Sequence, residues 1–174
     1  MKHIPEEHGH DVIVLGGSRG LGAAIVRKYL GRGCSVRSMA RTVAAFDCSG
    51  SLKQDVTDLA VARSWEELLP RTKPGRLFVC SAVAQFGRPS NDLAKWEAVV
   101  ATNVTGTIAL LDWAVHGLAT GSSIAWVASL SAIAVEPKWA GYAATKAAVI
   151  HYLRCMRGEA EKRGVSITDR KSVV

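Results

Sequence analysis

A tyrosine and a lysine four positions apart are the residues of this sequence best suited to acid–base chemistry. Tyr142 and Lys146 occur in the run YAATK, and on a helix this spacing places both side chains on one face, one turn apart. A phenol has a pKa of about 10, and a neighbouring ammonium stabilises the phenolate and lowers that pKa toward neutrality. Ser129 comes just after an expected strand, where parallel sheets present ligand-binding groups. Taken singly, Tyr142 is consistent with an aromatic residue on a helix surface, Lys146 with a solvated amine and Ser129 with a loop cap.

A glycine-rich segment near the start of the chain favours phosphate binding. Gly16, Gly20 and Gly22 occur in LGGSRGLG with the spacing G-x-x-x-G-x-G. Glycines let the backbone turn sharply and approach a pyrophosphate, while a helix N-terminus supplies N–H groups and a positive dipole end. A glycine-rich helix start without a ligand is the structural alternative. The G-K-[ST] ending of an ATP-binding phosphate loop and the commoner G-x-G-x-x-G dehydrogenase pattern are both absent.

The residues after the second expected strand bear on which dinucleotide would bind. An acid at position 40 would bind the ribose 2′-hydroxyl of NAD and repel a 2′-phosphate, but the residue there is Ala40, followed by Arg41. Arg41 and Arg19 could hold a 2′-phosphate through charge-assisted hydrogen bonds. The pattern favours NADP over NAD, although two ordinary surface arginines would look the same.

Short apolar runs alternate with helical periodicity along the chain, which predicts a doubly wound, three-layer α/β/α fold with a parallel sheet. We expect a single Rossmann-type domain over residues 11–174, after a polar N-terminal tail over 1–10. The connection 41–51 is too short for a full helix. The expected strands are 11–15, 34–39, 52–56, 76–80 and 124–128, and the expected helices are 21–30, 59–69, 92–101, 104–118 and 140–163.

Composition and charge restrict the class of protein. Hydrophobic residues make up 48% and charged residues 21% of 174 residues, which excludes a disordered chain, collagen or a disulfide scaffold. The formal net charge is +7, but the basic residues are scattered and lack aromatic interleaving, so an anionic small molecule is favoured over nucleic acid.

Cysteine usage and apolar patterning predict a soluble, cytoplasmic protein. The four cysteines form no C-x-x-C pair, which is typical of reduced thiols. The N-terminus lacks a signal-peptide apolar stretch, and Asp112 and His116 interrupt the best candidate for a membrane span. His3, His8 and His10 could bind a metal, but a solvated tail fits them better, and no metal site is predicted.

Taken together, these motifs resemble the short-chain dehydrogenase/reductase family over about residues 10–167. The resemblance implies that Tyr142 is the general acid–base, that Lys146 lowers its pKa and binds the nicotinamide ribose, and that Ser129 polarises the carbonyl oxygen. It implies that Asn103, in TNVTG, kinks its helix and anchors a water, and that long helices pair in homodimers or homotetramers. The cofactor contacts it implies are Gly16, Ser18, Arg19, Gly20, Leu21, Gly22, Arg41, Asp55, Val56, Ser81, Ala82, Tyr142 and Lys146.

The sequence departs from the family pattern at two points near the cofactor. The family's N-N-A-G is replaced by Cys80-Ser81-Ala82-Val83, and position 15, usually Thr, is Leu15. Val83 in place of glycine would crowd the nucleotide, so we expect weaker cofactor binding rather than lost chemistry.

A third departure concerns the end of the chain. The expected helix 140–163 uses most of the residues after Lys146, and a further strand–helix–strand unit needs roughly 30 residues. We therefore expect no room for the family's sixth strand or for the segments that follow it, as in a truncated or frame-shifted reductase.

Two functional hypotheses follow from the sequence. The first is an NADP-dependent oxidoreductase that interconverts a small-molecule carbonyl compound and a secondary alcohol. The second is a catalytically inactive nucleotide-binding fragment of such an enzyme. Gln85, Phe86 and residues 135–139 are expected to line the pocket wall and suggest a partly apolar substrate, without choosing among thioesters, steroids, sugars and ketones.

Overall fold

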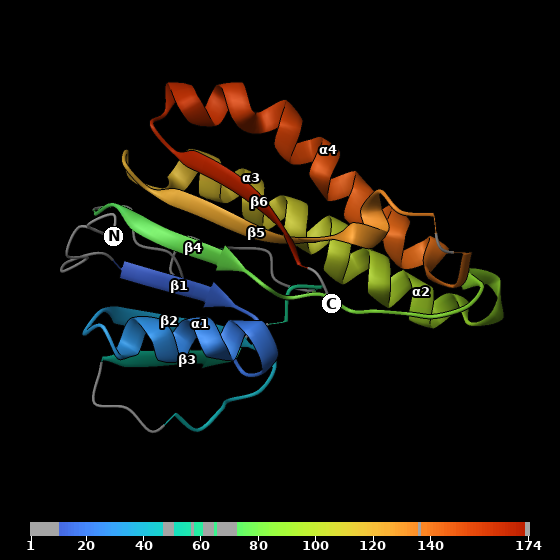
Figure 1. Ribbon diagram of the computed structural model, residues 1–174, viewed down its shortest axis with the longest axis horizontal. Helices are drawn as coiled ribbons and strands as arrows, with labels where there is room; N and C mark the ends of the chain where they lie inside the picture. Colours follow the sequence, from blue (N-terminus) through green and yellow to red (C-terminus); the bar gives the residue numbers. More distant parts are fainter. Residues whose placement is uncertain are drawn as a thin grey trace.

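Six parallel strands form one sheet in the order β3-β2-β1-β4-β5-β6. The computed structural model describes residues 11–46, 51–56, 58–60, 65, 73–135 and 137–172. The sheet in Figure 1 has the doubly wound arrangement expected from the alternation of strand and helix patterns, so the predicted fold class is confirmed. The strands are β1 (Asp11–Leu15), β2 (Ser35–Ala40), β3 (Leu52–Val56), β4 (Gly75–Val79), β5 (Ser123–Ser129) and β6 (Ser166–Ser172).

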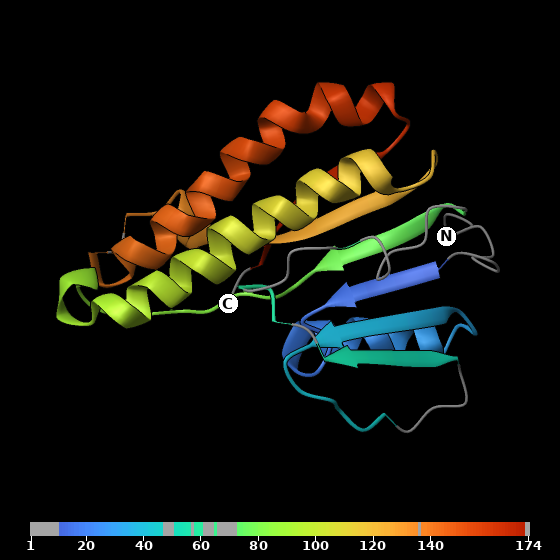
Figure 2. The ribbon, with the colours of Figure 1, turned by 180° about the vertical axis from the view of Figure 1, so that it is seen from behind.

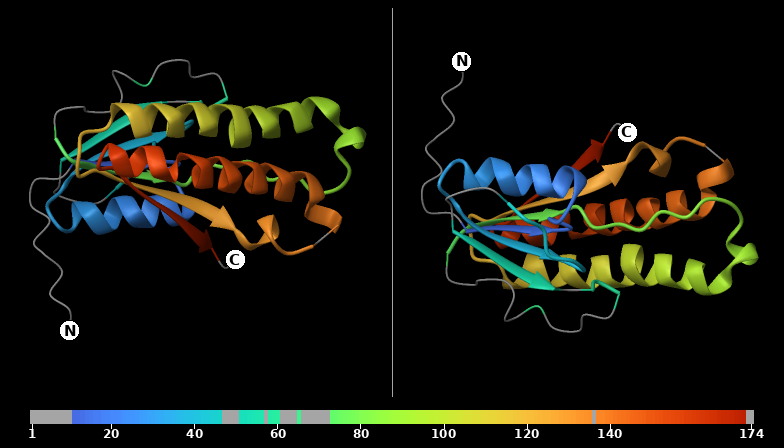
Figure 3. Two further views of the ribbon diagram at one scale, coloured as in Figure 1. Left: turned by 90° about the horizontal axis from the view of Figure 1, so that it is seen from above. Right: turned by 90° about the horizontal axis from the view of Figure 1, so that it is seen from below.

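Helices cover both faces of the sheet. Helix α1 (Gly20–Leu30) lies on one face, and α3 (Thr107–Gly117) and α4 (Ala140–Lys162) lie on the other (Figure 3). The two apolar cores match this division because side chains alternate between the faces of a strand. Val12 and Val14 of β1 pack with α1, while Ile13 packs on the opposite side.

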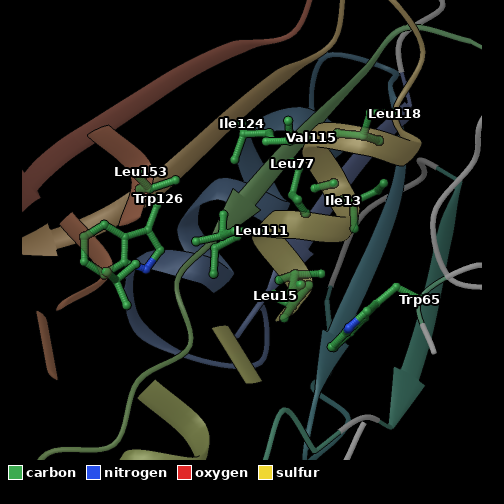
Figure 4. Close-up of a cluster of buried hydrophobic side chains, with 14 of the residues drawn as sticks. Ile13, Leu15, Trp65, Leu77, Leu111, Val115, Leu118, Ile124, Trp126 and Leu153 are labelled. Atoms are coloured by element: carbon green, nitrogen blue, oxygen red, sulfur yellow. The ribbon is translucent and has the colours of Figure 1, made fainter. Parts of the chain in front are cut away.

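The larger core lies between the sheet and helices α3 and α4. Trp126 of β5 and Leu77 of β4 are each 1% exposed and lie beside Leu111 and Leu153 of the two helices (Figure 4). Burial of these side chains supplies most of the driving force that holds the long helices on the sheet. The carboxyl ends of β1, β4 and β5 are thereby fixed at one edge.

One continuous helix, rather than the two expected, connects β4 to β5. Helix α2 (Leu93–Val100) runs through a π-helical segment (Ala101–Gly106) directly into α3, and Figure 2 shows them end to end. The extra residue per turn of a π-helix shifts the register of the apolar stripe. That shift is why the sequence pattern resembled two helices. Gly106 sits where a Cβ would lie 1.9 Å from the Leu59 carbonyl oxygen.

The same helix bears on the expectation that the chain has no membrane-spanning segment. By length and composition alone Leu93–Gly117 could cross a membrane, so Asp112 and His116 do not exclude it. In this structure 44% of its most apolar window is buried inside the protein, and Leu110 and Leu111 lie in the core. Core helices of soluble proteins pass the same test, so the observation is weak evidence for a membrane span.

The expectation that a sixth strand has no room is wrong. Strand β6 pairs with β5 from Ser123↔Ser166 to Ser129↔Ser172. The reason is that α4 is itself the crossover helix between these strands, so no further helix is needed. A tight turn suffices after Lys162, in which Gly164 adopts a φ of +68°.

Two further expectations concern the connections between strands. Residues 41–46 contain no helix, as the short length of this connection predicted. The expected helix 59–69 falls mostly outside the described residues, and Leu59 and Ala60 form a turn. The N-terminal tail 1–10 also lies outside the described part of the chain.

Candidate active site and cofactor cleft

The turn between β1 and α1 packs closely against the neighbouring strand ends. Gly16 has a φ of +77°, and a Cβ on it would lie 2.8 Å from the Ser81 backbone nitrogen. A Cβ on Gly22 would lie 2.1 Å from the Gly16 carbonyl oxygen. The Gly16 N–H donates to the Met39 carbonyl at 2.7 Å, which ties the turn to β2. The close packing explains why this turn needs glycine at both positions.

The start of α1 is open to an anionic ligand. Arg19 occupies the N-cap position, and its side chain makes no capping hydrogen bond. The first N–H groups of the helix therefore keep their capacity to donate, and the helix dipole favours negative charge there.

A cleft of about 540 Å³ opens at this edge of the sheet. It contains every predicted contact of the glycine turn, together with Arg41, Ser81 and Ala82. Asp55 and Val56 end β3, and their side chains lie outside the described part of the structure. The lining residues that we did not predict as cofactor contacts are Ala40, Thr42, Asp58, Leu59, Cys80, Val83, Thr102 and Val127.

Some of these missed residues had a signal in the sequence. Thr42 follows Arg41 directly, and its hydroxyl donates to the Ser18 hydroxyl at 3.4 Å across the cleft. Asp58 belongs to the run DVTD and accepts from the Ala60 N–H at 3.0 Å. Val127 had no such signal, because only the sheet order places the end of β5 beside the glycine turn.

The three predicted acid–base residues come together at the end of β5 and the start of α4. Ser129 is the last residue of β5 and is hydrogen-bonded to Tyr142, which lies in the first turn of α4. Lys146 follows one turn later and is 4% exposed. The Lys146 Nζ donates to the Val127 carbonyl at 3.0 Å and lies 5.8 Å from the centroid of the Tyr142 ring.

Ser131 is a further hydroxyl at this site. The Oγ atoms of Ser129 and Ser131 are 2.6 Å apart, and the Ser131 N–H donates to the Ser129 Oγ at 3.3 Å. These bonds hold the Ser129 side-chain oxygen in place. Sequence reasoning missed Ser131, for which the run S-L-S was the available signal.

Burial dominates the electrostatics of the site. It raises the pKa of Tyr142 above its usual value, and the hydrogen bond with Ser129 offsets part of this rise. Burial lowers the pKa of Lys146 to about 8, against the opposing charge effect of Cys80. The Lys146 ammonium is bound to the Val127 carbonyl and lies 4.6 Å from the Trp126 ring centroid, and the lowering of the Tyr142 pKa by Lys146 stays a prediction.

Cys80 lies in the cleft, where the family has an asparagine. Burial raises the pKa of its thiol to about 11, while the charge of Lys146 opposes that rise. The thiol is therefore protonated at neutral pH and is a poor nucleophile.

Asn103 connects three parts of the site through its side chain. Its Oδ1 accepts from the Val83 N–H at 2.8 Å, and its Nδ2 donates to the Val83 carbonyl at 2.7 Å and to the Thr145 hydroxyl at 3.2 Å. The residue lies in the π-helical segment and is 2% exposed. Its side chain therefore positions the loop after β4 against α4 rather than facing a substrate.

Among the described residues, Gln85 carries a buried side-chain oxygen without a hydrogen-bond partner. The residue is 7% exposed and lies in the same loop as Val83. In the part of the chain that the structure describes, no group of three or more His, Cys, Asp or Glu residues could hold a metal ion.

The strand order, the glycine turn and the cleft at the switch between β1 and β4 define a doubly wound α/β protein with a cleft where such folds bind their ligands. The sequence profile described as short chain dehydrogenase matches residues 10–169. The chain belongs to this family, and it is an oxidoreductase by that membership.

Known relatives agree with this assignment. The chain is 27% identical to 2-(S)-hydroxypropyl-CoM dehydrogenase 3 of Xanthobacter autotrophicus, over 90% of this chain and 68% of that protein. A short chain dehydrogenase family structure from Francisella tularensis matches with a TM-score of 0.77 and 20% identity, over 90% of this chain and 66% of that one. The structure of BdcA in complex with NADPH matches with a TM-score of 0.76 and 22% identity, over 91% and 68% respectively. These two structures show the fold alone, and the chain spans about two thirds of each relative.

Proposed function

We propose that this oxidoreductase transfers hydride between NADP and a carbonyl compound or secondary alcohol, with Tyr142 as the acid–base group. One observation carries the proposal: the glycine turn, two arginines and the Ser129–Tyr142–Lys146 group all lie at the carboxyl edge of one parallel sheet. Ligands of doubly wound folds bind at that edge, so one bound molecule can reach both regions.

The residues of the cleft fit a dinucleotide phosphate. Gly16 and Gly22 let the turn pack closely on itself and on Ser81, since a Cβ at either would meet backbone atoms under 3 Å away, and a turn without side chains lets a pyrophosphate approach its backbone. The uncapped start of α1 supplies N–H donors, and Arg19 and Arg41 supply positive charge for a 2′-phosphate. The bound nicotinamide would supply the hydride.

Proton transfer in this proposal belongs to the residues of β5 and α4. During carbonyl reduction the Tyr142 hydroxyl gives its proton to the oxygen that becomes the alcohol, and Ser129 donates a hydrogen bond to the same oxygen. The Lys146 ammonium stabilises the phenolate that remains. With a pKa of about 8, Lys146 still carries its charge at neutral pH. The reverse reaction uses the phenolate as the base.

The cofactor part of the proposal is tested by titrating the purified chain with NADPH and NADH and following tryptophan fluorescence. In Arg41→Ala we expect the Kd for NADPH to rise at least about tenfold, because one charge-assisted phosphate contact is lost. The Kd for NADH should stay within about twofold. Arg154→Ala, an exposed arginine of α4, is the control. Equal weakening of both nucleotides would contradict the NADP preference.

A nucleotide-binding protein without turnover is the second candidate. It is favoured by the raised pKa of Tyr142 and by the Lys146 ammonium bound to a backbone carbonyl. Saturable NADPH binding without oxidation of NADPH by any of a panel of ketones would select this candidate.

A further inference from the structure

A short row of aromatic rings leads away from the acid–base group. The centroids of the Trp139 and Tyr142 rings are 5.5 Å apart, and those of Phe86 and Trp139 are 3.8 Å apart. Phe86 belongs to the loop after β4, and Trp139 is the last residue before α4. The Gly87 N–H donates to the Lys138 carbonyl at 3.1 Å. The two loops that carry the rings are thus fixed to each other.

Phe86 at the outer end of this row is open to solvent, and further exposed apolar side chains belong to the loop that precedes Trp139. Phe86 is 65% exposed, and Ile133 and Leu130, in the loop between β5 and α4, are 58% and 38% exposed. Soluble proteins seldom expose large apolar side chains together unless a ligand or partner covers them. The position next to Tyr142 points to a small-molecule ligand, because an apolar wall with a few polar groups is the usual composition of such a pocket.

The first turn of α4 gives the row a rigid base. A Cβ on Gly141 would lie 2.8 Å from the Trp96 ring of α2 and 3.2 Å from Pro89. The backbone between Trp139 and Tyr142 is therefore packed closely on the neighbouring helix. A ligand ring that packs on this row meets a surface that is already ordered, which reduces the entropic cost of binding.

We propose that the substrate is an aryl ketone or aryl carbinol whose ring packs on Trp139 and Phe86. The inference rests on the proposed function, because it uses Tyr142 as the group that contacts the carbonyl oxygen. Aromatic rings pack at centroid distances of about 4.5–7 Å in tilted or offset arrangements. A ring on Trp139 therefore lies beside the phenol, and a carbonyl attached at or next to that ring can accept its hydrogen bond.

The test compares acetophenone with cyclohexyl methyl ketone, which has a similar size but no aromatic ring. In the wild type with NADPH we expect kcat/KM to favour acetophenone by about tenfold, as two aromatic contacts would give. In Trp139→Leu and Phe86→Leu the ratio should fall toward one. The control is Leu93→Ala, which removes an apolar side chain that is 60% exposed at the start of α2. This variant should keep the wild-type ratio. A wild-type ratio near one, or an unchanged ratio in Trp139→Leu, would overturn the proposal.

A binding measurement separates this inference from the proposed reaction. Saturation-transfer NMR with NADP present would compare 1-phenylethanol with 1-cyclohexylethanol. If no ketone is reduced, the proposed function is wrong, yet transfer to the phenyl ring that disappears in Trp139→Leu would still support the aromatic subsite. Absence of transfer in the wild type, or equal transfer in Trp139→Leu, would overturn the subsite whether or not turnover is seen.

Discussion

Lys146 carries a buried charge that, in the proposed mechanism, serves catalysis at the expense of stability. The side chain is 4% exposed, and its ammonium has one carbonyl and one aromatic ring as close neighbours. Such an environment disfavours the charged form, which is the reason for its lowered pKa. The same environment makes the ammonium effective when a phenolate forms nearby, because little water screens the two charges.

This burial predicts a specific pH dependence of stability. The pKa of Lys146 is about 8 in the folded chain against 10.5 as its usual value, so the unfolded state binds more protons between these two pH values. Stability should therefore rise with pH across that window in the wild type relative to Lys146→Met. At pH 7 the variant should be the more stable, on the order of 2 kcal/mol after the lost hydrogen bond is allowed for.

Urea denaturation of the cofactor-free proteins at pH 7 and pH 10 measures this difference. The advantage of Lys146→Met should shrink at the higher pH, where the folded wild type has lost the unfavourable charge. A variant that is less stable than the wild type at pH 7, with a gap that does not change by pH 10, would contradict this description of the site.

The glycine turn shows how an element places ligand-binding groups. The Gly16 carbonyl and the Gly22 Cα are so close that only hydrogen fits between them. Strand β1 and helix α1 can approach in this way only if the turn has no side chains at these positions, and that approach brings the N–H groups of the helix to the sheet edge.

Gly22→Ala is expected to weaken NADPH binding by at least about tenfold, because the turn must open to accept the methyl group. Gly158→Ala is the matched control, since a Cβ there meets nothing within 4 Å. Its position inside α4 predicts unchanged NADPH binding and a gain of about 1 kcal/mol in the free energy of unfolding. Fluorescence titration and thermal denaturation check both variants, and tight NADPH binding by Gly22→Ala would contradict the assigned role of the turn.

Sequence patterns predicted the strands and the fold class because short apolar runs between glycines are strong local signals. They did not predict the π-helical segment, in which Gly106 packs against Leu59 from a distant part of the chain. They also missed β6, since its pairing with β5 depends on α4 acting as the crossover helix. Ser129, Tyr142 and Lys146 could be found from order and spacing, whereas the partner of the Lys146 ammonium could not.

At the scale of the whole molecule, the sheet brings separate sequence motifs to one edge. The β1 turn and the end of β5 are far apart in the chain but lie on either side of the end of β4. The chain spans 68% of its relative from Xanthobacter autotrophicus, so the activity and assembly of such longer proteins are proposals for this chain. The pairing of long helices into dimers or tetramers stays a prediction.

Single-turnover reduction of acetophenone by wild type and Tyr142→Phe at pH 7, with the Kd for NADPH measured on the same samples, tests the acid–base role of Tyr142. We expect the rate constant to fall by about 10²–10⁴ in Tyr142→Phe, as removal of a general acid does. The Kd for NADPH should stay within about twofold. NADPH oxidation that is equally fast in Tyr142→Phe, or wild-type binding of NADPH with no reduction of any ketone, would show that Tyr142 is not the acid–base group of a ketone reductase.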